Sequence, residues 1–214
     1  MAARDFRYIV VEGPIGVGKT TLAKRLAGSL GGEALLEAPG DNPFLPRFYQ
    51  DPRTTALATQ LSFLFQRVRQ LEGIRQSDLF APVRVGDFMI EKDRLFAELT
   101  LDADELALYH QVYERIAGAA VTPDRVIYLQ APVDVLLARI AARGIAYEED
   151  MDPRYLDRVV AAYTRFFHHY EAAPLVIVNA AEIDFAHGDA DYAQLFDLLQ
   201  SISGGRHYLN PLPL

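Results

Sequence analysis

Cysteine is absent from this 214-residue chain, so neither a disulfide framework nor a thiolate metal site can form. This absence fits a reducing compartment, and we expect the protein to be cytoplasmic. The sequence also lacks an uninterrupted apolar run near the roughly 18 residues of a membrane helix. Residues 1–7 do not contain the apolar core of a signal peptide. We therefore expect no membrane partner.

Positive charge is also scarce, because 21 Lys and Arg face 29 Asp and Glu, a net charge of −8. A phosphate backbone attracts basic surfaces, so this balance argues against a nucleic-acid polymer as partner. A local cluster of Arg and Lys can still bind an anionic substrate. The chain contains no internal repeat and no low-complexity linker. We expect one domain spanning residues 1–214.

Short apolar runs alternate with longer helical patterns along the chain. The strand candidates are residues 8–11, 34–36, 83–85, 125–129 and 175–178. The helical patterns cover residues 19–30, 52–72, 103–119, 133–143, 153–170 and 190–201. Strands joined through helices predict a three-layer α/β fold, with a five-stranded parallel sheet and helices on both faces. Ligands of such folds bind at the carboxyl ends of the strands, where Glu37 and Asp87 stand.

A glycine-rich motif follows the first predicted strand and opens the first predicted helix. Residues 13–20 read Gly-Pro-Ile-Gly-Val-Gly-Lys-Thr and match G-x-x-x-x-G-K-[ST] at every fixed position. The glycines let backbone N–H groups surround phosphates, Lys19 would reach the β- and γ-phosphates, and Thr20 would coordinate Mg²⁺. Glu37 or Asp87 would assist the metal through water. The motif predicts a fold that binds ATP with Mg²⁺ through Gly13, Gly16, Gly18, Lys19, Thr20 and Thr21.

The rest of the sequence favours a small-molecule kinase among P-loop proteins. No Asn-Lys-x-Asp guanine signature is present, and Arg84 and Gly86 interrupt the apolar run that a Walker-B strand requires. A small-molecule kinase needs a carboxylate near the acceptor hydroxyl and cations near the transferred phosphoryl group. Glu37 is placed for the first task. Arg139 and Arg143 lie four residues apart on one helix face and suit a lid over residues 139–152.

Taken together, these residues resemble the deoxynucleoside kinase family, which includes the bacterial deoxyadenosine and deoxyguanosine kinases. The similarity covers nearly the whole chain, and the set of motifs in this order is specific. It is carried by residues 12–16 at the start of the P-loop, Glu37 with residues 41–49, Gln60 with Arg67, Arg139 with Arg143-Gly144, Tyr147-Glu148, and residues 182–185.

The resemblance implies transfer of the ATP γ-phosphoryl group to the 5′-hydroxyl of a deoxynucleoside, and a homodimer. Glu37 would be the catalytic base, with Lys19, Arg139 and Arg143 as catalytic cations. The adenine of ATP would contact Asp184 and Phe185. The substrate would contact Tyr49 and Glu148 at the 3′-hydroxyl, Gln60 at the base edge, and Asp93 with Arg67 in support. Asp87 would also belong to the substrate site, and Phe48, Phe63 and Phe88 would form an aromatic wall beside the base.

Two positions depart from the family pattern. The third strand of the family ends in an acidic residue followed by Arg, whereas this chain has Asp87-Phe88. We hypothesise that Lys92 or Arg94 supplies the missing cation. The family's Arg-Gly-Arg of the lid is replaced by residues 143–145, Arg-Gly-Ile. Loss of one preorganised cation costs several kcal/mol of transition-state stabilisation, so weak activity is one expectation.

Other interpretations remain open from the sequence. A nucleoside monophosphate kinase such as a thymidylate kinase would need cations for the acceptor phosphate, for which Arg47 and Arg67 are candidates. A catalytically silent nucleotide-binding module is favoured slightly by the missing Arg at position 88. Gln60 with Asp93 favours an amino-bearing base over thymine. An aromatic stripe at helical spacing predicts a core or dimer face, formed by Tyr163, Phe166, Phe167 and Tyr170.

Overall fold

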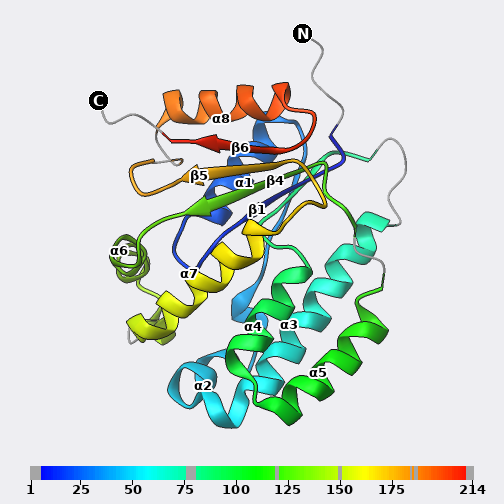
Figure 1. Cartoon of the computed structure of the whole chain (residues 1–214), viewed down its shortest axis with the longest axis vertical. Coiled ribbons are helices and arrows are strands. Elements are labelled where there is room, and N and C mark those ends of the chain that lie inside the picture. The colour runs from blue at the N-terminus through cyan, green and yellow to red at the C-terminus, as the bar shows by residue number, and fades with distance from the viewer. Residues whose placement is uncertain are drawn as a thin grey trace.

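A computed structural model describes residues 6–75, 81–118, 121–148, 151–183, 185 and 188–210 of the chain. Within them, one sheet of parallel strands runs in the order β2-β3-β1-β4-β5-β6 (Figure 1). The strands are β1 Tyr8–Glu12, β2 Glu33–Leu35, β3 Arg84–Gly86, β4 Arg125–Gln130, β5 Leu175–Asn179 and β6 Arg206–Leu209. The predicted α/β fold is confirmed, but the expected number of five strands was wrong, because the described residues form six.

Helices cover both faces of the sheet and complete the three layers (Figure 1). One face carries α1 Lys19–Ser29, α6 Val133–Arg143 and α8 Asp189–Ser201. The other face carries α3 Pro52–Arg75, α4 Glu91–Thr100, α5 Ala103–Ile116 and α7 Pro153–His168. The remaining described helices are short: α2 Leu45–Gln50 and the 3-10 helices η1 Pro39–Asp41 and η2 Ala146–Glu148.

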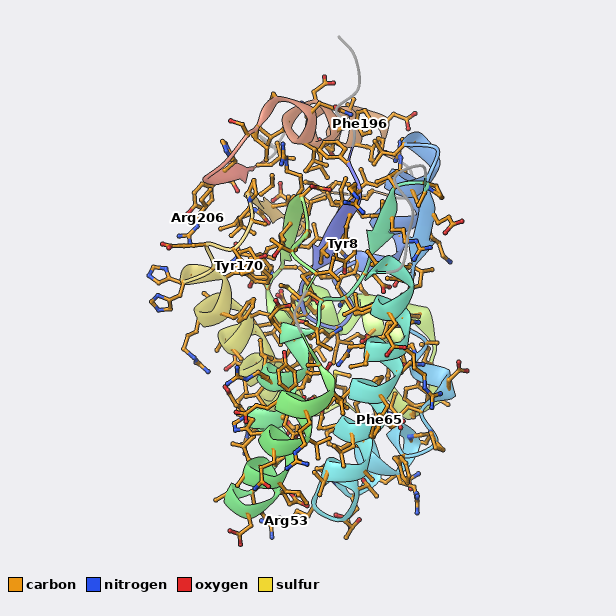
Figure 2. The ribbon with its side chains drawn as sticks, turned by 90° about the vertical axis from the view of Figure 1, so that its right-hand side faces the viewer. Tyr8, Arg53, Phe65, Tyr170, Phe196 and Arg206 are labelled. Atoms are coloured by element: carbon orange, nitrogen blue, oxygen red, sulfur yellow. The ribbon has the colours of Figure 1, made fainter. Side chains whose placement is uncertain are left out.

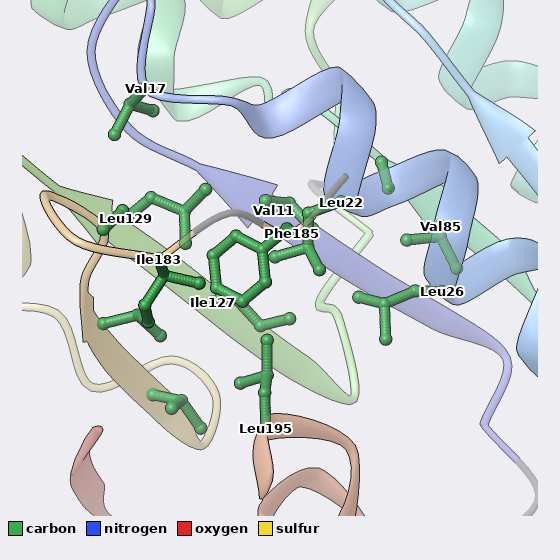
Figure 3. Close-up of a cluster of buried hydrophobic side chains, with 14 of the residues drawn as sticks. Val11, Val17, Leu22, Leu26, Val85, Ile127, Leu129, Ile183, Phe185 and Leu195 are labelled. Atoms are coloured by element: carbon green, nitrogen blue, oxygen red, sulfur yellow. The ribbon is translucent and has the colours of Figure 1, made fainter. Parts of the chain in front are cut away.

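The side chains of the central strands point alternately to the two faces of the sheet, which gives each face its own core. In β1, Ile9 and Val11 enter the core under α1, whereas Tyr8 and Val10 enter the core under α3 and α7. Successive strand residues point to opposite faces, so a fully apolar strand serves two cores at once. Figure 3 shows the first core, with the ring of Phe185 beside aliphatic side chains from β1, β4 and α8. This packing fixes the carboxyl end of β1, from which the P-loop starts.

The strand that the sequence did not predict is β6, at the edge of the sheet. It is short and partly exposed, and Tyr208 has 63% of its surface accessible. Its residues Arg-His-Tyr-Leu lack the continuous apolar run of a central strand, so no sequence signal marks it. Backbone pairing to β5 creates it. The helices α2 and α4 were also not predicted, and the proline in the first turn of α2 is compatible with a helix start.

The aromatic stripe of α7 belongs mainly to the core. Tyr163 and Phe167 are buried and stack on Tyr128 of β4, with ring centroids 6.1 and 4.3 Å away. Tyr170 is also buried, whereas Phe166 is only partly covered.

The helical half of the molecule extends away from the sheet. Arg53, near the amino end of α3, lies at the opposite end from Phe196 of α8 (Figure 2). Among the described residues, no helix combines the length and apolarity needed to cross a membrane.

Candidate active site

The P-loop joins the buried strand β1 to helix α1 and requires its glycines. Gly13 and Gly16 have φ angles of 149° and 83°, a region that favours glycine. A Cβ atom at Gly13 would lie 2.5 Å from the carbonyl oxygen of Leu129, and one at Gly16 would lie 2.9 Å from that of Leu136. The loop is therefore packed closely against β4 and α6, with space for backbone only.

Lys19 is folded back into this loop. Its Nζ atom donates to the carbonyl oxygens of Gly13 and Pro14 at 2.8 and 3.0 Å. Burial, together with the nearby Lys92 ammonium, lowers the pKa of Lys19 to about 8. A phosphate group would restore the preference for the charged form, because an opposite charge favours ionisation. The loop thus holds a cation that phosphate binding would stabilise.

Asp87, at the end of β3, connects the P-loop to the end of β2. The Thr20 hydroxyl donates to its Oδ2 atom at 2.6 Å, and the Glu37 backbone N–H donates to its Oδ1 atom at 2.7 Å. These hydroxyl and carboxylate oxygens are the hard donors that Mg²⁺ prefers. The described residues contain no cluster of three or more His, Cys, Asp or Glu side chains able to hold a metal. A magnesium ion here would depend on phosphate oxygens and water for its other ligands.

A cavity of about 480 Å³ opens beside the P-loop and collects most of the predicted site residues. Its walls come from the P-loop, the end of β2, and helices α2, α3, α4 and α7, with η2 at one side. Among the predicted residues, those that line it are Gly16, Lys19, Thr20, Glu37, Phe48, Tyr49, Gln60, Phe63, Arg67, Asp87, Arg143 and Glu148.

Other predicted residues lie elsewhere. Gly13, Gly18, Thr21, Phe88, Asp93, Arg139 and Phe185 are not part of the wall of this cavity. Phe88 and Phe185 are buried in the two cores, so neither ring is free to contact a ligand. Asp184 lies outside the described residues.

In the cavity wall, Glu37 is held between two cations. Arg67 donates to Glu37 Oε1 from Nε at 2.8 Å and also from Nη2, and Lys92 Nζ lies 3.0 Å from Oε2. Burial favours the neutral carboxyl, but Arg67 and Lys92 outweigh it and lower the pKa of Glu37 to about 2. Glu37 is therefore ionised at neutral pH and held in one orientation.

The structure distinguishes between Lys92 and Arg94, the two residues that we hypothesised to supply the cation missing at position 88. Lys92 is 6% exposed, lies on α4 and reaches into the cavity. Arg94, two residues later, is exposed and lies over the ring of Tyr113 at 5.6 Å, away from the cavity. Of these two cations, Lys92 is the one that can compensate for phenylalanine at position 88.

Asp93 supports Arg67 from behind. It is fully buried and accepts a hydrogen bond from Arg67 Nη1. Burial raises the pKa of Asp93 despite the opposing effect of Arg67. Arg67 lines the cavity and Asp93 does not, whereas the sequence prediction placed Asp93 at the base with Arg67 in support.

The lid residues close one side of the cavity. Arg143 pairs with Glu148, and the ring of Tyr147 stacks on Tyr49 with centroids 5.7 Å apart. Arg139 points elsewhere, because its guanidinium donates to the carbonyl oxygens of Val17, Ala180 and Ala181. In this structure Arg139 links the P-loop to the chain after β5, and of these two arginines Arg143 is the one that lines the cavity.

Two further residues around the cavity were not identified from the sequence as parts of the site. Glu12 is fully buried and accepts hydrogen bonds from the backbone of Gly13 and Met89 and from the hydroxyl of Tyr163. Burial raises its pKa, although Lys92 and Lys19 oppose this. Tyr163 also lines the cavity. Glu12 therefore links the P-loop to α7 and to the chain after β3. A charged residue at the end of a predicted strand gives no sequence signal that its side chain is buried.

The fold and this constellation define the class of protein. A P-loop beside a cavity that contains an ionised carboxylate, two buried cations and hydrogen-bonding side chains belongs to a phosphotransferase that acts on a small molecule.

Comparison with known proteins identifies the family. Residues 9–202 match the family model described as deoxynucleoside kinase, and the chain belongs to this family. It is 32% identical over 196 residues to the deoxyguanosine kinase of Bacillus subtilis, covering 88% of this chain and 93% of that protein. It is 30% identical over 194 residues to the deoxyadenosine kinase of Lactobacillus acidophilus, covering 84% and 88%. The protein is thus a deoxynucleoside kinase, an ATP-dependent phosphotransferase.

Solved structures show the same fold. The deoxyadenosine kinase from M. mycoides with bound dCTP aligns with a TM-score of 0.77 and 23% identity, covering 91% of this chain and 100% of that chain. The same enzyme with the products dCMP and dCDP aligns with a TM-score of 0.80 and 24% identity over the same shares.

Proposed function

We propose that this kinase phosphorylates purine deoxynucleosides at the 5′-hydroxyl, with ATP and Mg²⁺ as donor. The observation that carries the proposal is the pairing of the cations around the cavity. Arg67 and Lys92 are bound to Glu37, and Arg143 is bound to Glu148. Among the described lining residues, the remaining cation is Lys19, which belongs to the P-loop. A neutral nucleoside suits this acceptor site better than a nucleoside monophosphate, whose phosphate needs a cation of its own.

The arrangement also separates this proposal from the monophosphate kinase alternative. Arg47 lies over the ring of Phe44 at 5.6 Å and does not line the cavity. Arg67 is already shared between Glu37 and Asp93. Neither of the two cations that the alternative requires is therefore available without breaking an existing interaction.

Glu37 would bind the 5′-hydroxyl and take its proton. The oxygen–phosphorus bond forms at the 5′-oxygen while the bond to the leaving ADP breaks, and the proton moves to the carboxylate. Since phosphoryl transfer passes through a loose transition state, positioning of the hydroxyl matters more than the strength of the base. A carboxylate with a pKa near 2 is a weak base, and the two cations hold it in a fixed orientation. Mg²⁺ would neutralise phosphate charge from the side of Thr20 and Asp87.

The sugar and base would occupy the rest of the cavity. Tyr49 and Glu148 lie together at the lid and suit the 3′-hydroxyl, and Gln60 and the ring of Phe63 suit the edge and the face of the base. The named relatives at 30% identity or more are a deoxyguanosine and a deoxyadenosine kinase, which supports a purine. The intact cluster of Lys19, Thr20 and Glu37 argues against a catalytically silent module.

A phosphate-transfer assay with ATP and Mg²⁺ tests the proposal. The four common deoxynucleosides and their four monophosphates are supplied in parallel, and ADP release and the phosphorylated product are measured. We expect turnover of deoxyadenosine or deoxyguanosine that exceeds turnover of thymidine and of every monophosphate by at least roughly tenfold. Faster turnover of a monophosphate would establish the alternative acceptor instead. ATP binding without any turnover would establish the silent module.

We also propose that the protein is a homodimer that associates through α4 and α7. A groove between α4, α5 and α7 is lined by Leu95 and Phe166 together with charges of both signs, including Glu91 and Arg165. A self-complementary face of this kind suits a two-fold dimer. Light scattering of the wild type and of Phe166→Arg tests the proposal, since we expect a dimer for the first and a monomer for the second.

A further inference from the structure

Gln60 lines the cavity from α3, and a neighbour outside the cavity wall fixes its amide group. The Gln60 Nε2 atom lies 3.2 Å from Oγ1 of Thr100, the last residue of α4. The Thr100 hydroxyl lies 2.7 Å from the carbonyl oxygen of Phe96. A carbonyl can only accept, so the single hydroxyl proton of Thr100 is donated to Phe96. Towards Gln60, Thr100 can therefore act only as an acceptor.

This arrangement determines the orientation of the amide. The atom of Gln60 that faces Thr100 must be the nitrogen, because a flipped amide would bring two acceptor oxygens together without a proton between them. The assignment follows from the hydrogen-bonding capacity of Thr100 and does not depend on telling nitrogen from oxygen by shape. The amide oxygen is left on the side away from Thr100.

We propose that Thr100 is a positioning residue that sets base discrimination by fixing the amide of Gln60. The inference rests on the proposed role of Gln60 at the base edge. Adenine and guanine present opposite patterns on the same edge: a 6-amino donor beside an acceptor nitrogen, and a 6-oxo acceptor beside an N–H donor. A fixed amide matches one of these patterns in a given orientation of the base. An amide that is free to flip matches both.

The surrounding structure keeps Thr100 in place. Leu101, the next residue, packs against the small cluster of Leu45, Phe48 and Ala56 under the cavity. Phe96, which supplies the carbonyl, itself lines the cavity. Helices α3 and α4 are extensively packed on each other. The acceptor is thus presented from a rigid helix end, as a specificity-determining contact requires.

The test is the ratio of kcat/KM for deoxyadenosine and deoxyguanosine. In the wild type we expect a preference of at least fivefold in one direction. Thr100→Val keeps the shape of the side chain and removes the hydroxyl. We expect this variant to reduce the preference between the two nucleosides about tenfold. Where the wild-type preference is smaller than tenfold, the ratio should fall to one. Thr100→Ser retains the hydroxyl and should restore the wild-type ratio. Thr164→Val is the matched control, because Thr164 makes the same hydrogen bond to the carbonyl four residues earlier, on α7 and away from Gln60.

A second background separates action through Gln60 from a general structural effect. In Gln60→Leu the amide is gone, so Thr100→Val should leave the ratio within twofold. An active wild type without a preference, or a ratio that Thr100→Val does not change, overturns the inference and leaves the kinase assignment intact. A ratio that Thr100→Val still changes in the Gln60→Leu background also overturns it. A wild type that phosphorylates neither nucleoside overturns the proposed function and this inference with it.

Discussion

We propose that Lys92, which lines the cavity and pairs with Glu37, takes the place of the cation that the family carries after its third strand, so that its removal should impair catalysis. We consider Lys92→Met, which keeps the length of the side chain and deletes the charge. Lys92 Nζ lies 3.0 Å from Glu37 Oε2 in a buried setting. With an effective dielectric constant of about 20, Coulomb's law gives an attraction of about 5.5 kcal/mol at this distance.

That attraction stabilises the ionised carboxylate in the ground state, so it does not itself measure the catalytic loss. The loss in the transition state comes from the action of the ammonium group on the transferred phosphoryl group and from the orientation that it gives Glu37. Arg67 remains on the other Glu37 oxygen, and methionine avoids the cost of burying an ammonium group. We therefore expect a loss of about 3 kcal/mol, which corresponds to a decrease of roughly 100-fold in kcat. The KM for the deoxynucleoside should change much less, since Lys92 acts on Glu37 and the phosphoryl group and not on the base.

The assay is steady-state ADP release with saturating ATP and the preferred deoxynucleoside. Arg94→Gln serves as the comparison, because Arg94 is the other cation that the sequence suggested and it lies outside the cavity wall. We expect this variant to remain within threefold of the wild type. A Lys92→Met enzyme with an unchanged kcat, or a larger loss of kcat in Arg94→Gln, would show that Lys92 is not the catalytic cation.

Three further predictions concern the donor site, the sugar site and the core. Because burial and Lys92 lower the pKa of Lys19 to about 8, the free protein loses this proton as the pH rises through 8, whereas phosphate binding requires it. Titration calorimetry should therefore give a constant Kd for ATP below pH 8 and a rise approaching tenfold per pH unit above it; a flat profile up to pH 9.5 would contradict this. Tyr49→Phe should reduce kcat/KM roughly tenfold for a 2′-deoxynucleoside but less than twofold for its 2′,3′-dideoxy analogue, and equal losses for both would exclude a contact with the 3′-hydroxyl. Phe185→Ala should lower the free energy of unfolding by about 3 to 5 kcal/mol in urea titrations, because the ring is buried in the core, whereas Tyr208→Ala on the exposed edge strand should change it by less than about 1 kcal/mol.

The parts of the fold that could be predicted are those with strong local signals. Helix α6 was predicted over its observed residues, and Gly144, with φ of 66°, ends it as expected of a glycine stop. The P-loop could also be predicted, because its glycines, lysine and threonine stand at the fixed positions of a known motif. Strand β6 has no such signal, because its formation depends on the exposed backbone of β5 and not on its own residues.

The candidate site shows the same limit at the level of single side chains. The sequence could name Lys92 and Asp93, but these neighbours point in different directions on α4, about 100° apart. Only the packing of α4 against α3 determines that Lys92 reaches the cavity and that Asp93 sits behind Arg67. Because α4 was not predicted, the sequence could not show which of these two side chains reaches the cavity.

Arg139 illustrates the limit of transferring roles by motif. It matches the position of a lid cation, yet its guanidinium is engaged by three backbone carbonyl groups in this structure. Arg139 and Arg143 are four residues apart on α6, a spacing that places two side chains on the same face of a helix. Spacing alone does not reveal which surface that face meets.

In the proposed mechanism Glu37, held by Arg67 and Lys92, receives the proton of the 5′-hydroxyl during transfer. The most direct measurement is single-turnover transfer from γ-labelled ATP to the preferred deoxynucleoside, by the wild type and by Glu37→Gln, with ATP affinity determined in parallel. We predict that the glutamine variant transfers roughly 1000-fold more slowly while its Kd for ATP stays within threefold of the wild type. Transfer at a rate near that of the wild type would contradict the account.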